Sequence, residues 1–288
     1  PGAGTLSPSG VPANCDDCDY IATGGLRSVY KDTAESFDLL TRAASLTFDY
    51  DFGNMVLTAI ASDQSTDMGL VQDSDQSPIP KGVPGGTTDS AVVTQRSDQQ
   101  TLEVRLASAT GGPVEWLLGL YYLDENAFQS TLINRDPTFG AAKTIEPLHD
   151  VNSKSSAVFG QFSIQPDDTL KLTAGFRTTN DEKDAVGGTK VQIRPPCGGP
   201  FCWVNVGSQA YSPEDSWSSG TYKLGIDKYI NDDRMVYATM STGYKAGGFN
   251  FGVSSAESYD PEELTAFEIG SKNRFNDGRM QLNATVFY

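Results

Sequence analysis

Long apolar runs are absent from this sequence of 288 residues. No segment approaches the roughly 18 consecutive apolar residues that a transmembrane helix requires, so a helical membrane protein is excluded. A membrane-spanning β-barrel is not excluded by the same observation, because its wall alternates apolar with polar side chains and keeps a low average hydropathy. The mean hydropathy of −0.35 therefore leaves the choice between a soluble domain and a barrel to the order of the residues.

Basic residues are also few, with 21 Lys and Arg against 37 Asp and Glu and a formal net charge of −16. Nucleic acid is excluded as a partner, because phosphate backbones are held by clustered Lys and Arg and the sequence has no basic stripe. We interpret the acidity as solvated loop surface in preference to a mouth that gathers cations.

Residues suited to catalysis or metal binding are scarce. His149 is the only histidine, which argues against a histidine-based metal or catalytic site. Asp181, Glu182 and Asp184 lack the spacing of an EF-hand loop, so we interpret them as solvated side chains rather than calcium ligands. The sequence therefore predicts no enzyme, no metal site and no cofactor.

The four cysteines form two close pairs, Cys15 with Cys18 and Cys197 with Cys202, within segments rich in Gly, Pro and Asp. Neither pair has the surroundings of a zinc ribbon or of a redox-active motif. We predict two small loop disulfides, formed in an oxidising compartment, in preference to free thiols. The first residues carry neither a basic n-region nor an apolar h-region, so we expect processing or truncation to have removed any signal peptide.

Alternation of apolar and polar side chains is clearest between residues 234 and 288. Along 236–245 one set of positions is mainly apolar and the other polar: Val236, Ala238, Met240, Thr242 and Tyr244 against Tyr237, Thr239, Ser241, Gly243 and Lys245. A period of two is that of a β-strand with one face in an apolar environment. Further along, Asn276, Asp277 and Gly278 predict a tight hairpin, since Asp-Gly readily adopts the positive φ angles of such turns.

The same pattern predicts ten strands, joined alternately by tight turns and by long connections at about 67–97, 129–153, 184–213 and 247–260. Unstructured loops beyond about 12–15 residues are uncommon in compact domains, whereas transmembrane barrels place short turns at one rim and long loops at the other. We therefore predict an all-β fold, an antiparallel transmembrane β-barrel. Open sheet edges are not tolerated in a bilayer, so we expect these ten strands to be part of a larger barrel.

Several segments carry a resemblance to a known family. They read YATMSTGYKAGGFN (237–250), YDPEELTAFEIGSKNRF (259–275) and RMQLNATVFY (279–288), and the upstream segments 107–125 and 157–183 agree with them. From about residue 36 onward the chain resembles the β-barrel of TonB-dependent outer-membrane receptors. The resemblance implies about twenty-two strands around a plug domain. We expect residues 1–35 to form an outer loop and residues 36–288 part of the barrel, with the plug and the C-terminal strands absent.

The resemblance implies active uptake of a scarce nutrient across the bacterial outer membrane. A ferric siderophore is the expected cargo, with cobalamin or a carbohydrate as alternatives. The expected partners are outer-membrane lipid, the cargo, and the TonB-ExbB-ExbD complex, reached through a plug and a TonB box that are not recognisable in this chain. Two other interpretations stay open, a passive porin and a secreted β-sandwich binding module.

Two groups of residues are candidates for a site. Five lie at the outer end of a predicted strand and are expected to face the ligand: Tyr244, Lys245, Phe249, Asn250 and Phe251. Nine charged residues on the polar face are expected to contact the plug, or else to hydrate the lumen: Glu103, Arg105, Lys171, Arg177, Lys223, Asp227, Glu268, Lys272 and Arg274.

Overall fold

The computed structural model describes residues 34–74, 87–109, 111–137, 142–194, 204–251 and 256–288. The described chain is built from strands: β1 (Ser36–Asp51), β2 (Met55–Asp73), β3 (Thr87–Ser108), β4 (Val114–Pro137), β5 (Ala142–Asp167), β6 (Leu170–Arg194), β7 (Val204–Tyr211), β8 (Glu214–Asn231), β9 (Arg234–Lys245), β10 (Gly248–Phe251), β11 (Ala256–Tyr259), β12 (Glu262–Phe275) and β13 (Met280–Phe287). Over these ranges no helix has the length and apolar character needed to cross a membrane. The four cysteines and nearly all of the predicted outer loop 1–35 lie outside the described residues.

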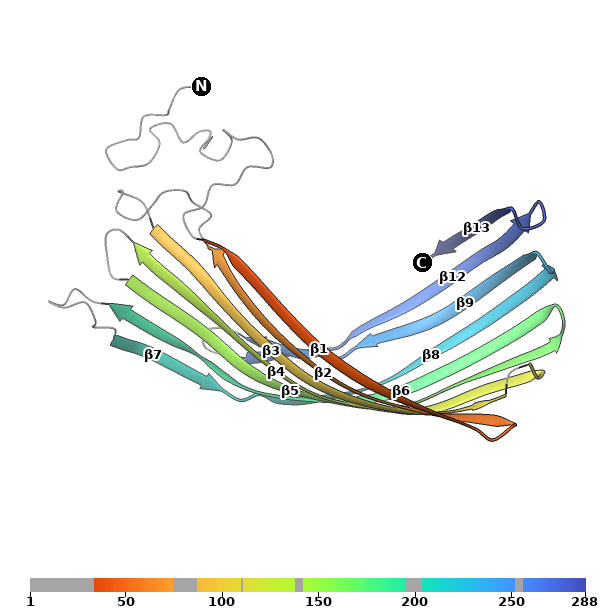
Figure 1. Cartoon of the computed structure of the whole chain (residues 1–288), viewed down its shortest axis with the longest axis horizontal. Coiled ribbons are helices and arrows are strands. Elements are labelled where there is room, and N and C mark those ends of the chain that lie inside the picture. The colour runs from red at the N-terminus through yellow and green to blue at the C-terminus, as the bar shows by residue number, and fades with distance from the viewer. Residues whose placement is uncertain (1–33, 75–86, 110, 138–141, 195–203, 252–255) are drawn as a thin grey trace, which may run out of the picture.

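Ten of the strands form one antiparallel meander, in the order β1-β2-β3-β4-β5-β6-β8-β9-β12-β13. An eleventh, β7, pairs with the far half of β6, and β10 and β11 form a separate hairpin. The sheet is strongly curved and open, with β1 and β13 at its two edges (Figure 1). The prediction of an incomplete antiparallel barrel with ten consecutive wall strands is confirmed.

Short turns join the strands at one end of the sheet, as the sequence predicts (Figure 1). Gly53 and Gly111 occupy such turns with φ of 90°, a conformation that side chains with a Cβ rarely adopt. In the last turn Asn276 and Asp277 both have φ of 54° and Gly278 follows at 80°. Asn and Asp adopt this left-handed region more readily than other residues that have a side chain. The predicted hairpin therefore forms at these three residues.

The long connections are much shorter than the sequence predicts. Residues expected in loops continue the strands, so that β2 runs to Asp73, β4 to Pro137 and β6 to Arg194. The longest strand, β5, has 26 residues and spans about 85 Å at about 3.3 Å per residue, far more than the roughly 25 Å apolar band of a barrel. Beyond the bilayer both faces of a strand meet water. The hydrogen bonds between strands therefore continue there, although the apolar and polar side chains no longer alternate.

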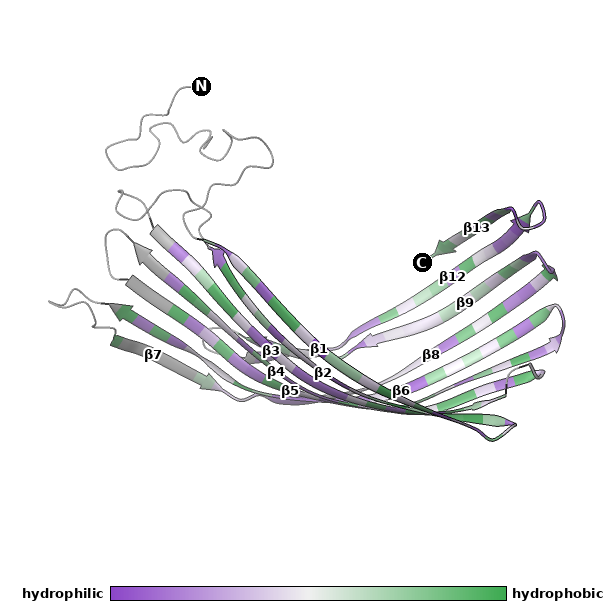
Figure 2. Ribbon diagram, in the orientation of Figure 1, coloured by the Kyte–Doolittle hydropathy of each residue, from purple (hydrophilic) through white to green (hydrophobic). Residues whose placement is uncertain are grey.

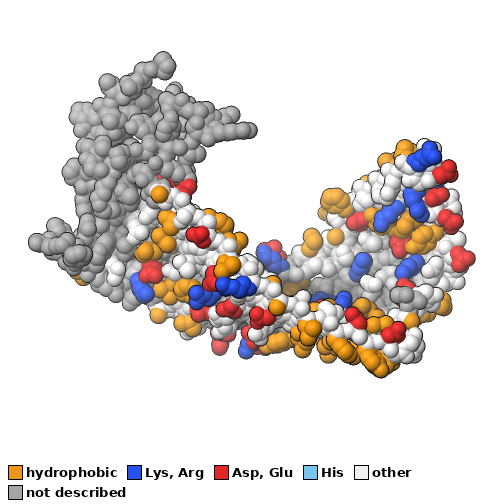
Figure 3. Space-filling view, in the orientation of Figure 1, with side chains coloured by type: hydrophobic (Ala, Val, Ile, Leu, Met, Phe, Trp, Pro, Cys, Tyr) orange, Lys and Arg blue, Asp and Glu red, His pale blue; other side chains and the backbone are white. Residues whose placement is uncertain are grey.

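The apolar side chains form rows across neighbouring strands, on the face called here the lipid face. One row runs through residues paired in register: Phe162, Ala174, Leu224, Met240 and Phe267. Leu224 is 52% exposed and Ile269 67%. Hydrophobic and hydrophilic residues alternate along the strands (Figure 2), and apolar side chains gather on the surface near the short turns (Figure 3). In a protein surrounded by water an apolar surface of this extent would be a liability.

Only four apolar residues are buried within the described ranges, namely Ala91, Ala157, Ala185 and Phe249. This part of the chain therefore has no dry interior between two facing sheets. The β-sandwich interpretation required such an interior and is wrong.

Candidate functional site

The polar face of the sheet, called here the lumen face, carries the nine charged residues that the sequence nominates. Their register and spacing place them opposite to the apolar rows. Glu103 and Arg105 form an ion pair with Nε and Oε1 3.1 Å apart. The guanidinium of Arg177 lies 5.3 Å from the ring centroid of Tyr121 and 5.6 Å from that of Phe159. These distances fit cation–π contacts, which hold Arg177 against the wall.

Most of the remaining charges of the lumen face also find partners within the wall. Lys171 Nζ lies 3.0 Å from Glu115 Oε2, and Lys272 Nζ lies 5.4 Å from the ring centroid of Tyr237. The Tyr237 hydroxyl donates to the Glu268 carboxylate, and Arg274 donates to the Asp232 carbonyl at 2.8 Å. Lys223 lines a shallow hollow together with Arg177, and Asp227 pairs in register with Lys171. Contact of these residues with a plug stays a prediction.

An aromatic cluster lies on the lumen face beyond the membrane-spanning rows. It is formed by the β10–β11 hairpin against three strands and consists of His149, Tyr211, Trp217, Phe249 and Phe251. The rings of Phe251 and His149 are stacked with centroids 4.1 Å apart and 11° between their planes. Tyr211 stacks on Phe251 at 5.7 Å, and Trp217 lies 6.4 Å from Phe249. The hairpin is thus folded inward onto the wall.

A lysine and two glycines fix the hairpin at this place. Lys183 Nζ donates to the carbonyl oxygen of Gly247 at 2.9 Å and lies 5.9 Å from the ring centroid of Trp217. A Cβ on Gly247 would lie 2.3 Å from the carbonyl oxygen of Tyr259, and one on Gly187 would lie 2.6 Å from a backbone oxygen. Both contacts are with backbone atoms that cannot rotate away. Glycine at 247 therefore lets the hairpin close against Tyr259, and glycine at 187 makes room for His149 and Tyr211, on which Phe251 stacks.

The polar atoms of the cluster are buried and neutral. His149 Nδ1 and the Tyr211 hydroxyl are buried without a hydrogen-bond partner among the described residues. Burial lowers the pKa of His149 and raises the pKa of Tyr211, so both side chains are uncharged at neutral pH. No group of His, Cys, Asp and Glu in the described ranges is arranged to hold a metal ion. The cluster offers partly exposed aromatic rings, which suit recognition of a ligand.

The five predicted ligand residues have different surroundings. Phe249 is 9% exposed and packs inside the cluster, whereas Asn250 beside it is exposed. Phe251 stacks between His149 and Tyr211. Lys245 pairs with Glu262 at 3.1 Å at an exposed position, and the Tyr244 hydroxyl is buried. Their contact with a ligand stays a prediction.

The sequence pattern misses His149, Tyr211 and Trp217. The first two lie in segments expected to be loops, for which no face could be assigned. As the only histidine, His149 has no partner in the sequence that would predict a metal or catalytic site, and its aromatic ring gives no local signal. The continuing register is the signal that would have found it, since His149 lies ten residues before Phe159 on the same strand and pairs with Gly187.

Comparisons with known proteins agree with this architecture. A family model described as TonB dependent receptor-like, beta-barrel, matches residues 4–288. The ferric yersiniabactin uptake receptor FyuA from Yersinia pestis aligns with a TM-score of 0.68 and 18% identity over 87% of this chain and 35% of its own. The siderophore receptor PiuA from Acinetobacter baumannii aligns with a TM-score of 0.60 and 14% identity, over 87% of this chain and 40% of its own.

A third similar structure is the closed form of the ferric-catecholate import receptor Fiu from E. coli, with a TM-score of 0.60, 15% identity, and coverage of 100% of this chain and 45% of that one. The chain thus spans less than half of the length of each of these structures, and at such identities the likeness shows the fold alone. The match of the family model over almost all of the sequence decides the family. The chain belongs to the TonB-dependent receptors, a family of the bacterial outer membrane, and its sheet is part of the β-barrel of that family.

Proposed function

We propose that the receptor containing this wall binds a ferric siderophore at its outer mouth and imports it actively. The observation that carries the proposal is the aromatic cluster, which lies on the lumen face at the end opposite to the short turns. In barrels of this type the short turns are periplasmic, so the cluster faces the external medium. The similar structures FyuA and PiuA are a ferric yersiniabactin uptake receptor and a siderophore receptor, which supports the same class of cargo.

The chemistry of the cluster favours a flat, polarisable ligand. Phe251, Tyr211 and His149 are stacked and uncharged, and Asn250 on β10 adds an exposed amide beside them. Each additional aromatic contact with a ligand is worth about 0.5–1.5 kcal/mol. A ligand with aromatic or planar iron-chelating groups would therefore gain several such contacts.

Active import requires parts that this chain does not show. We propose that energy arrives from the TonB-ExbB-ExbD complex through a plug and a TonB box. The charges of the lumen face that are not committed to an ion pair, with Lys223 and Asp227 as the first candidates, would contact the plug. We further propose that residues 1–35 form an outer connection and that residues 36–288 are wall.

Uptake of labelled iron tests the proposal. The receptor, expressed from its complete reading frame in an iron-starved host lacking other siderophore receptors, is supplied with ferric catecholate, hydroxamate or carboxylate siderophores. We expect one class to be taken up only in cells that contain TonB. Phe251→Ala is expected to weaken binding of that class about tenfold, the equivalent of about 1.4 kcal/mol, whereas Phe48→Ala on the lipid face is expected to leave it unchanged.

Passage of small solutes that does not depend on TonB would establish a passive porin instead. Uptake of cobalamin or of a carbohydrate, with no siderophore transported, would keep active import but change the cargo. If Phe251→Ala and Phe48→Ala changed binding of the siderophore equally, the aromatic cluster would not be the cargo site.

A further inference from the structure

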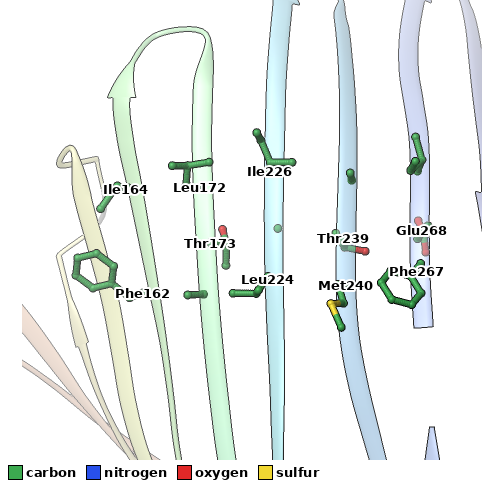
Figure 4. Close-up of a pocket in the computed structure, with 14 residues that line it drawn as sticks. Phe162, Ile164, Leu172, Thr173, Leu224, Ile226, Thr239, Met240, Phe267 and Glu268 are labelled. Carbon is green, nitrogen blue, oxygen red and sulfur yellow. The ribbon is translucent and has the colours of Figure 1, made fainter. Parts of the chain in front are cut away.

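An open apolar groove with a volume of about 560 Å³ crosses the lipid face near the short turns. Its lining includes the large side chains of Phe162, Leu224 and Phe267 (Figure 4). Ala174 and Ala238 also line it, and their small side chains leave space between the larger ones. Apolar side chains of neighbouring strands lie side by side along it (Figure 4). The groove is therefore a shallow, continuous apolar channel rather than a set of separate gaps.

The register of the strands gives the groove its course. Ala174 pairs with Phe162 on one side and Leu224 on the other, and Ala238 stands between Ile226 and Ile269. From β5 to β12 the groove crosses four steps between strands, about 19 Å at about 4.8 Å per step. This length accommodates an extended hydrocarbon chain that lies across the strands.

Two cations lie on the lipid face beside the groove, on the side of the short turns. Lys228 follows Ile226 by two residues on β8, and Arg234 precedes Val236 by two residues on β9, so both share the face of the groove. Lys228 Nζ donates to Thr169 Oγ1 at 2.6 Å and also attracts the nearby carboxylate of Asp167. Arg234 lies 5.1 Å from the ring centroid of Phe275. Both are thus placed to meet a phosphate at the boundary of the bilayer.

We propose that this groove binds one phospholipid of the periplasmic leaflet, with an acyl chain in the groove and its phosphate on Lys228 and Arg234. Three observations favour this occupant over a protein. The groove lies on the face that a bilayer covers, its lining is almost wholly apolar, and its cations are at the periplasmic side, where short turns lie. The lipid would act as a structural ligand of the wall, and its binding does not depend on which cargo the receptor imports.

The lipid content of the purified receptor tests the proposal. The complete receptor is extracted from outer membranes, carried through extensive detergent exchange and weighed by native mass spectrometry. We expect about one phospholipid to remain per receptor. In Ala238→Phe, which fills this space, and in the Lys228→Gln, Arg234→Gln double variant, retention is expected to fall about tenfold.

Two matched substitutions serve as controls. Ala59→Phe enlarges a lipid-face alanine that pairs with Val104, away from the groove, and Lys154→Gln removes an exposed lysine on the lipid-face side of β5, far from the short turns. Both should keep the lipid, and gel mobility before and after heating reports that each variant is folded. After delipidation, phosphatidylethanolamine, phosphatidylglycerol and lipopolysaccharide are added separately, and one of the two phospholipids is expected to rebind.

Unchanged retention in Ala238→Phe, or equal loss in Ala59→Phe, would overturn the proposal. Preferential rebinding of lipopolysaccharide would do so as well, because that lipid belongs to the opposite leaflet. Complete loss of lipid from the unmodified receptor under mild exchange would show that no specific site exists.

Discussion

Gly247→Ala is expected to release the β10–β11 hairpin from the lumen face while the wall stays folded. The added Cβ would lie 2.3 Å from the carbonyl oxygen of Tyr259 and 2.6 Å from a ring atom of Trp217. The carbonyl belongs to the partner strand of the hairpin and cannot move without displacing it. Overpacking of this kind costs about 1–3 kcal/mol, so amide exchange in residues 248–251 should accelerate by about 5-fold to 150-fold.

Gly243→Ala is the matched control on the same segment of chain. A Cβ there would lie 3.6 Å from Leu264 Cβ, an ordinary contact, and its φ is not in the left-handed region. Exchange in 248–251 is expected to be unchanged in this variant. If Gly247→Ala also left exchange unchanged, the anchoring of the hairpin by close packing would be wrong. In the functional assay, release of the hairpin should weaken binding of the cargo without reducing the amount of receptor in the membrane.

Leu224→Arg is expected to be the most destabilising single change in the wall. Leu224 is 52% exposed on the lipid face and belongs to the apolar row between Ala174 and Met240. An arginine on the lipid face near the middle of the bilayer costs about 2–4 kcal/mol in a transmembrane barrel. Denaturant unfolding of the complete receptor in phospholipid vesicles should show this loss as a lower midpoint.

Thr239→Arg is the control for this prediction. Thr239 lies one residue before Met240 and pairs with Glu268, so the new arginine would enter the lumen face beside a carboxylate. Its effect on stability is expected to be small. A similar loss in both variants would show that the two faces of the sheet do not meet different solvents.

The sequence predicts the membrane-spanning half of the wall well because each strand there meets two different solvents. Leu224 and Ile226 alternate with Lys223 and Asp227, and the same contrast holds on the strands beside them. Where one face of a strand meets lipid and the other meets water, apolar and polar side chains alternate in step with the pleat of the strand. The strands and their faces can therefore be assigned without long-range information.

The outer half of the wall could not be predicted from alternation because polar side chains occupy both faces there. Asn126 donates to Asp150 at 2.7 Å and to Asn152 at 2.8 Å, and Asn152 donates to Asp184 at 3.1 Å. Such amide and carboxylate ladders join neighbouring strands in water as apolar rows do in lipid. These ladders leave no alternation of apolar and polar residues in the sequence, so the segments that carry them resemble loops.

The candidate site could be predicted only in part for a related reason. Phe249 and Phe251 lie in a segment whose likeness to the family marks it, but their partners come from three other strands. The contact between Phe251 and His149 joins residues about a hundred positions apart, and no local period reports it. The folding of the hairpin onto the wall is thus a tertiary event, set by Lys183 and by the space that Gly187 and Gly247 leave.

Spin labels placed one at a time at positions 221 to 226 of β8, in a receptor whose native cysteines are all replaced by serine, test the division into two faces most directly. Collision rates with oxygen, which dissolves in the bilayer, and with a water-soluble nickel chelate are measured in membranes. Labels at 222, 224 and 226 should collide mostly with oxygen, and labels at 221, 223 and 225 mostly with nickel. Uniform access of the nickel chelate to all six positions would show that this strand does not line a bilayer.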